Sequence, residues 1–113
     1  MPRKRRSGDR VPAAIHDAVR TLGANIAQAR LRRRLRQEDL ARRAGISRGT
    51  VVAVERGETG TSIQAYTACL WALGLLEELG LLASTQVDEE GVRLLDARLG
   101  ERARSTRGIA DDF

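Results

Sequence analysis

Arginine is the side chain with the most evident chemistry in this sequence. All but one of the 20 basic residues are arginines, the exception being Lys4. Guanidinium groups bind phosphate, and the edge of guanine, through two parallel hydrogen bonds. Residues 1–56 carry 15 basic and 5 acidic side chains, a net charge of +10, whereas residues 57–113 carry 5 and 10, a net charge of −5. We expect a polyanion to bind the first half and a different partner to face the second. A GC-rich coding bias would also enrich arginine.

The sequence gives little support for a catalytic site, a metal site or a base-stacking surface. Cys69 and His16 are each the only residue of their type, so the sequence predicts no internal disulfide, no cysteine-based zinc site and no histidine-centred catalytic site. The three aromatic residues, Tyr66, Trp71 and Phe113, are too few for a base-stacking platform. We therefore expect no enzyme, metal, cofactor or small-molecule substrate. Without an apolar stretch of membrane-spanning length or a secretory signal, a cytoplasmic protein is expected, nucleoid-associated when bound to DNA.

Residues 37–56, QEDLARRAGISRGTVVAVER, contain two short amphipathic segments around a tight turn. Gly45 suits the turn because a sharp connection between helices needs a residue that tolerates positive φ. Ser47 is a good N-cap for the second segment. Ala41 is small enough for two helices to cross closely there. This order is typical of a helix-turn-helix, whose second helix docks in the DNA major groove, and an ordinary helical hairpin is the alternative.

Apolar residues recur at helical spacing in several segments that are separated by glycine or polar turns. We expect an all-α domain of five helices, over residues of about 12–34, 37–44, 48–56, 62–73 and 75–82. Two of these helices are expected to bury a face each, formed by Ile15, Val19, Leu22 and Ile26, and by Ile63, Tyr66, Leu70 and Leu73. Residues 1–11 should form a flexible, disordered basic arm, residues 12–83 the domain, and residues 84–113 an acidic tail, partly helical or disordered.

The segment LRQEDLARRAGISRGTVVAVERGET resembles the Xre/Cro family of phage-repressor-type helix-turn-helix proteins, over roughly residues 19–82. The positions that match the family are Gln37, Leu40, Ala41, Gly45, Ile46, Val51, Val54, Glu55 and Gly57. The resemblance implies a five-helix domain that binds double-stranded DNA as a homodimer, at an operator with two half-sites. It also implies a structural ion pair between Arg30 and Glu55, with two solvated charges as the alternative.

The same resemblance assigns the DNA contacts. The base-contacting positions are Arg48, Gly49, Thr50 and Ala53. The phosphate-contacting positions are Gln37, Arg36, Arg34, Ser47, Arg56 and Thr61. The chain departs from the glutamine-rich members because Gly49 has no side chain and Ala53 offers only a methyl group. Arg48 is therefore the best candidate for a specific contact, to guanine.

A leucine-rich segment follows the helix-turn-helix. It offers more apolar surface than one face of a short helix can bury, so a homodimer interface is expected there. The interface residues are Leu75, Leu76, Leu79 and Leu82. The alternative is that these leucines complete the core of the monomer.

The C-terminal part has a second, looser resemblance. LGLLEELGLLA, then DEEGVRLLDARLGERAR and a final DDF, is similar to the Xre-type, HipB-like antitoxins that are encoded beside HipA-like serine/threonine kinases. It implies an autoregulating repressor whose acidic half docks a kinase toxin. The alternatives are a free-standing Xre-type repressor and a protein-interaction module without specific DNA readout.

Overall fold

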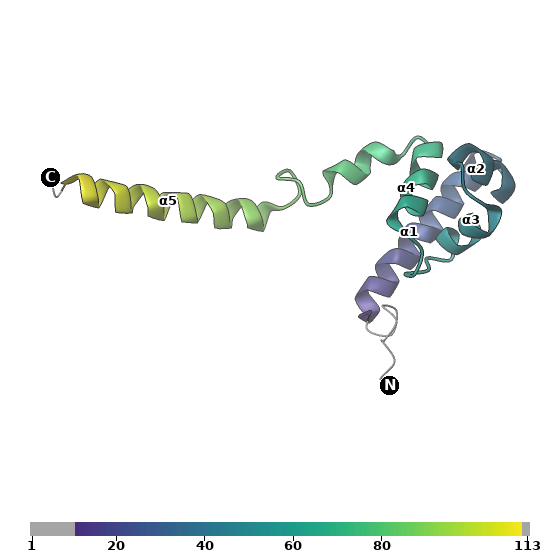
Figure 1. The fold of residues 1–113 in the computed structure, drawn as a ribbon, viewed down its shortest axis with the longest axis horizontal. Helices are drawn as coiled ribbons and strands as arrows, with labels where there is room; N and C mark the ends of the chain where they lie inside the picture. Colours follow the sequence, from purple (N-terminus) through teal and green to yellow (C-terminus); the bar gives the residue numbers. More distant parts are fainter. Residues whose placement is uncertain (1–10, 112–113) are drawn as a thin grey trace, which may run out of the picture. The chain divides into compact units, whose positions relative to one another are not determined.

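The computed structural model describes residues 11–111, and the side chains as far as residue 105 (Figure 1). Its helices are α1 (Ala13–Arg32), α2 (Gln37–Ala44), α3 (Arg48–Glu55), α4 (Ile63–Ala72), a 3₁₀ helix (Leu76–Leu81) and α5 (Glu89–Asp111). No strand occurs in the described residues, which confirms the all-α prediction for that part of the chain. The basic arm predicted over residues 1–11 lies almost entirely outside it.

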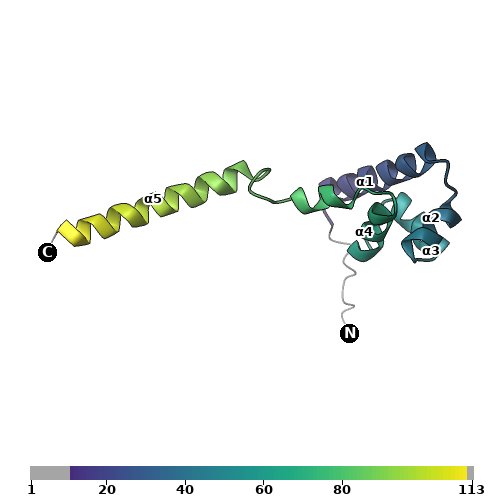
Figure 2. The same cartoon turned by 90° about the horizontal axis from the view of Figure 1, so that it is seen from above.

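The chain divides into two units, with the boundary between Leu76 and Glu77. In the first unit, α1 and α2 each pack against both α3 and α4. Helices α2 and α3 lie side by side in both views (Figures 1 and 2). The largest fully buried side chains are Ile26, Leu40, Val51, Val54 and Cys69. These residues form a small core that holds α3 in a fixed position on the unit.

The predicted start and stop signals of the helices are confirmed. Gly45 ends α2 with φ of 71°, in the left-handed region. The Oγ of Ser47 accepts a hydrogen bond from the backbone N–H of Thr50 (3.1 Å), and Ser62 caps α4 in the same way. Each cap satisfies one backbone donor that the first turn of a helix leaves without a partner. The two helices of the motif are therefore held by local interactions at both ends of the turn.

Two residues expected in the core are not there. Ile15 and Ile63 lie in the first turns of their helices, where they are 49% and 70% exposed. Periodicity gave each helix a correct buried face, but that face loses its packing partner where the helix extends past its neighbours. Cys69 is buried as expected, and burial raises the pKa of its thiol to about 11. The thiol is therefore protonated and unreactive at neutral pH.

The first of the C-terminal elements also differs from the expectation. The segment predicted as an α-helix over residues 75–82 is a 3₁₀ helix, which is used mainly in short pieces, and Gly80 lies within it. The predicted tail contains the 23-residue helix α5. Asp88 precedes this helix, and its Oδ1 accepts a hydrogen bond from the N–H of Gly91 (3.1 Å), as an N-cap does. Among the described residues, no helix is long and apolar enough to cross a membrane.

Gly23 marks the closest approach of α1 to the end of α3. A Cβ atom there would collide with the carbonyl oxygen of Val54 and lie 2.8 Å from the backbone nitrogen of Gly57. Because backbone atoms cannot move aside cheaply, we expect Gly23→Ala to lower the free energy of unfolding by about 2–3 kcal/mol. Urea unfolding followed by circular dichroism measures this.

The control is Gly49→Ala on the outer face of α3, where the nearest atom to the new Cβ is the Oγ of Ser47 at 3.9 Å. It should leave the stability unchanged or raise it by about 0.5 kcal/mol, because alanine favours a helix. Equal unfolding midpoints for the two variants would show that α1 does not approach α3 this closely.

Candidate nucleic-acid interface

A buried ion pair joins α1 to α3. Arg30 Nε donates to Glu55 Oε2 (2.7 Å) and Arg30 Nη2 donates to Glu55 Oε1 (3.0 Å), with side chains 11% and 7% exposed. Gln37, the first residue of α2, donates from Nε2 to the same Glu55 Oε1 (3.1 Å), and Arg30 Nη1 donates to the carbonyl oxygen of Leu35 (2.7 Å). The expected Arg30–Glu55 pair is therefore present. It ties three helices together next to the start of α2.

The N-terminus of α2 is held by an acid from its first turn. The Oδ2 of Asp39 accepts a hydrogen bond from the backbone N–H of Arg36 (2.9 Å), which is the return half of a capping box. Arg36 has no acceptor atom, so the forward half cannot form. The backbone N–H and the guanidinium of Arg36 hold the pKa of Asp39 below its usual value. The carboxylate therefore stays charged and keeps the start of α2 in place near neutral pH.

Arg36 is paired but exposed. Its Nη1 lies 2.9 Å from Oε1 of Glu38, and its Nε lies 3.4 Å from Oδ2 of Asp39, while its own side chain is 73% exposed. Exposed pairs of this kind contribute little free energy. The guanidinium can therefore leave its two acids for a phosphate at small cost.

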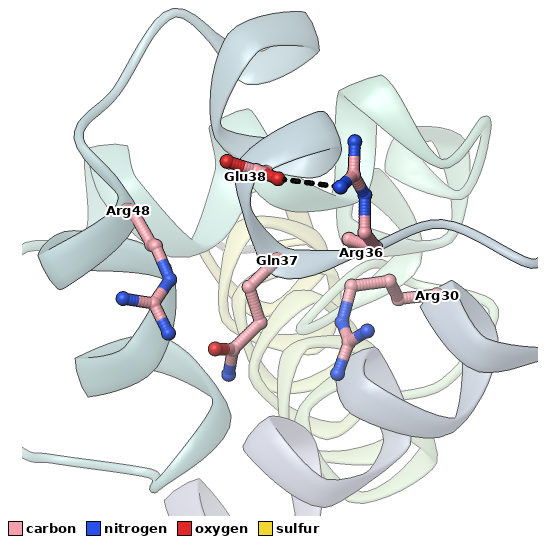
Figure 3. A pocket seen from close by; sticks show the side chains of 5 residues that line it. All are labelled: Arg30, Arg36, Gln37, Glu38 and Arg48. Carbon is pink, nitrogen blue, oxygen red and sulfur yellow. Dashed lines mark ion pairs between the residues drawn. The ribbon is translucent and has the colours of Figure 1, made fainter.

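Arg48 lies across a hollow of about 420 Å³ from Arg36. The hollow is lined by Arg30, Arg36, Gln37, Glu38 and Arg48 (Figure 3). In the close view Gln37 lies between the side chains of Arg48 and Arg30, while Arg36 turns toward Glu38. Arg48 is exposed, and its side chain has no hydrogen-bond or ion-pair partner within the described part of the chain. It is thus a free cation at the first position of α3.

The other three predicted base-contacting residues also lie on α3, with different access to solvent. Gly49 is exposed, and a Cβ atom there would come no closer to a side chain than 3.9 Å, at the Oγ of Ser47, so another molecule can approach the backbone. The Oγ1 of Thr50 already forms a hydrogen bond with the Oγ of Ser47 (2.8 Å). Ala53 is half-buried. Arg48 is therefore the one long polar side chain of the four.

The predicted phosphate-contacting residues are spread over the turns around α2 and α3. The side chain of Gln37 donates to Glu55, and the Oγ of the exposed Ser47 accepts from Thr50, while Arg36 is exposed beside the start of α2. Arg34, in the turn before α2, is exposed and has φ of 55°. Arg56 is exposed at the end of α3, and Thr61 is half-buried in the loop before α4.

Two residues outside the predicted site, both from α1, lie near Arg56. A second hollow, of about 310 Å³, is lined by Arg56, Gly57 to Gly60 and, from α1, His16 and Arg20. The i, i+4 spacing of His16 and Arg20 places both on one face of α1. That spacing was a usable signal, but the approach of Gly57 to the backbone of Arg20 appears only in three dimensions.

The four leucines predicted to form a dimer interface are divided between the two units. Leu75 packs against the core of the first unit, and Leu76, 37% exposed, ends that unit. Leu79 and Leu82 belong to the second unit, where Leu82 is exposed. Leu75 is half-buried against the core of the monomer, and the dimer interface at the four leucines stays a prediction.

Helix α2, the turn at Gly45 and helix α3 form a helix-turn-helix, the class of DNA-binding unit that presents its second helix to a groove. A family model described as a helix-turn-helix domain matches residues 21–80. The match covers more than half of the chain, which therefore belongs to the helix-turn-helix domain family. A comparison with curated proteins finds no match.

Proposed function

We propose that the protein is a sequence-specific transcriptional repressor that binds double-stranded DNA by inserting α3 into the major groove. The observation that carries the proposal is the exposed guanidinium of Arg48 at the start of α3, which has no partner among the residues that the structure describes. A guanidinium there can donate two hydrogen bonds to O6 and N7 of guanine. Gly49 supports this docking because it has no side chain, so the backbone next to Arg48 can approach the DNA groove closely.

The positions of the phosphate contacts support the same docking. Arg36 lies at the positive end of the α2 dipole, where backbone N–H groups also favour an anion. Arg34 adopts a left-handed conformation that costs a non-glycine residue about 1–2 kcal/mol. Glycine would fit this position without strain. An arginine is explained if its exposed charge, beside the start of α2, binds phosphate.

We further propose that the repressor acts as a homodimer on two half-sites. One copy presents one recognition helix, and a two-fold dimer would present two at about one helical turn of DNA. The exposed leucines of the segment after α4, Leu76 and Leu82, support a contact between copies there, beyond what the monomer core uses.

The test is selection of bound duplexes from a random library by the purified full chain. The expected product is a pseudo-palindrome whose half-sites are about 10 base pairs apart, centre to centre, with a guanine at the same place in each. Recovery of single half-sites would reject the dimer, and recovery without any enriched sequence would reject specific readout.

A finer proposal is that the repressor is the antitoxin of a HipA-like kinase and regulates its own operon. The supporting observation is that residues 77–90, next to the helix-turn-helix unit, carry five acidic and no basic side chains. Such a segment repels phosphate and suits a basic protein surface.

The test of the antitoxin proposal is co-purification with the product of the adjacent gene, using the full chain and a chain that ends at Leu82. Recovery by the full chain alone would support docking through the C-terminal residues. Equal recovery by both chains would remove those residues from the interface, and recovery by neither would leave a free-standing repressor.

A further inference from the structure

The hollow between α1 and the loop that follows α3 has walls that the backbone holds in place. Its volume is about 310 Å³, and it is lined by His16 and Arg20 of α1, by Arg56 and by residues 57–60. A Cβ atom on Gly57 would lie 2.7 Å from the backbone nitrogen of Arg20, so α1 and the loop are in close contact. The hydroxyl of Tyr66 donates to the carbonyl oxygen of Glu58 (2.8 Å) and holds the loop from inside. The hollow is therefore formed before any ligand binds.

The side chains of this hollow are mostly hydrogen-bond donors. Arg20 and Arg56 bring two guanidinium groups, and the ring of His16 donates from at least one nitrogen in either charge state. The side chains of His16 and Arg56 have no hydrogen-bond or ion-pair partner in the part of the chain that the structure describes. Arg20 has an exposed contact with Asp17 at 3.9 Å, which a ligand can replace at small cost. Glu58 contributes an exposed carboxylate to the same lining.

Backbone donors add to these side chains. The backbone N–H groups of Thr59 and Gly60 donate to no acceptor among residues 11–111. His16 lies in the first turn of α1, which has no acidic residue and where the helix dipole favours an anion. Guanidinium groups together with free backbone N–H groups are typical of sites that bind phosphate.

The hollow lies at the opposite end of α3 from Arg48. Arg56 follows Arg48 by eight positions, which corresponds to about 12 Å along a helix that rises about 1.5 Å per residue. The major groove is also about 12 Å wide. When Arg48, at the start of α3, reaches the base edges, the other end of the helix is therefore close to the phosphates at the edge of the groove.

We propose that this hollow holds one phosphate of the DNA backbone, so that His16 and Arg20 of α1 are DNA contacts outside the helix-turn-helix. The inference rests on the proposed DNA binding and adds to it a contact from a helix that otherwise only supports α3. A free phosphate ester has the same chemistry, and the experiments below distinguish it from DNA.

The first test is the dissociation constant of the full chain for the selected operator duplex. His16→Gln with Arg20→Gln is expected to raise it about tenfold, for operator and random duplexes alike, and to make the salt slope shallower by about 1 for each hollow in the complex. Glu58→Gln should lower the dissociation constant, because a carboxylate beside the hollow repels phosphate. An unchanged constant and slope for the His16 and Arg20 variant would overturn the proposal.

Two variants control for charge in general. Arg93→Gln with Arg98→Gln removes two exposed charges outside the hollow and should change the dissociation constant less than about twofold, since salt screens such charges. Arg20→Lys keeps the charge and should retain most of the affinity. A loss as large in the Arg93 and Arg98 variant as in the His16 and Arg20 variant would overturn the proposal, because net charge alone would then explain both.

The second test identifies the phosphate, with duplexes that carry one uncharged methylphosphonate linkage at a time. One position in each half-site should weaken binding of the wild type and have little further effect on the His16 and Arg20 variant, because both changes remove the same contact. Additive losses at every position would overturn the proposal.

The third test separates the two sources of phosphate. Inorganic phosphate is titrated into the DNA-free protein and followed by the imidazole resonances of His16, and we expect no saturation. Saturation, with duplex affinity unchanged in the His16 and Arg20 variant, would assign the hollow to a free phosphate ester. A wild type that binds no duplex would overturn the proposed function as well, whereas duplex binding whose specificity depends on Arg48 but whose affinity ignores His16 and Arg20 would overturn this inference alone.

Discussion

Replacing Glu55 with alanine is expected to lower the free energy of unfolding by about 3–5 kcal/mol. The substitution leaves the guanidinium of Arg30 buried without its carboxylate, and it also removes the acceptor of the Gln37 amide. Removing one partner from a buried pair is costly because the remaining charge has lost both water and its counter-ion. Urea unfolding of the full chain, followed by helical circular dichroism, measures the change.

The control for this substitution is Glu58→Ala, three residues further along the chain, where the side chain is exposed. It should change the stability by less than about 0.5 kcal/mol. The double variant Arg30→Met, Glu55→Leu should lose much less than the sum of the two single changes, because no unpaired charge remains. Additive losses would mean that the two side chains do not act as a pair.

Replacing Arg48 with alanine is expected to cost about 1–3 kcal/mol of binding free energy per half-site, and to relax the preference at one base pair in each. The physical reason is the loss of two hydrogen bonds to guanine from a side chain that has no competing partner among residues 11–111, the part of the chain that the structure describes. Titration of the selected operator and of duplexes with the guanine replaced measures both effects.

The comparison variant for Arg48 is Arg56→Ala, at the other end of α3. Arg56 is expected to contact phosphate, so its loss should weaken all duplexes by about the same factor. If Arg48→Ala weakens operator and random DNA equally, then Arg48 is only a phosphate contact and the specificity comes from elsewhere on α3.

The helix-turn-helix was predictable because its signals are local. Gly45 and Ser47 act through the conformation and hydrogen bonds of their own turn, so the bounds of α2 were correct to the residue. The Arg30–Glu55 pair spans 25 positions, and it came from a family resemblance rather than from spacing. The participation of Gln37 in this pair depends on how three helices meet, which no local pattern describes.

The C-terminal part was less predictable because its signals depend on partners. Asp88 and the acids that follow it are a recognisable helix start, yet Gly91 and Gly100 disfavour a long helix in isolation. Leu75 looked surplus because five leucines lie close together in sequence, and only the packing of the first unit shows that the core uses it. Local pattern thus identifies apolar residues without identifying what covers them.

The central claim is that the basic surface around α2 and α3 binds the DNA backbone, and the most direct measurement is the dependence of duplex affinity on salt concentration. Each phosphate neutralised contributes about −0.9 to the slope of log K against log salt. With about six phosphate contacts per dimer, from the arginines around the motif, we expect a slope of about −5 or steeper. A slope shallower than about −3 would contradict it, because too few phosphates would then be bound for this surface to be the DNA-binding face.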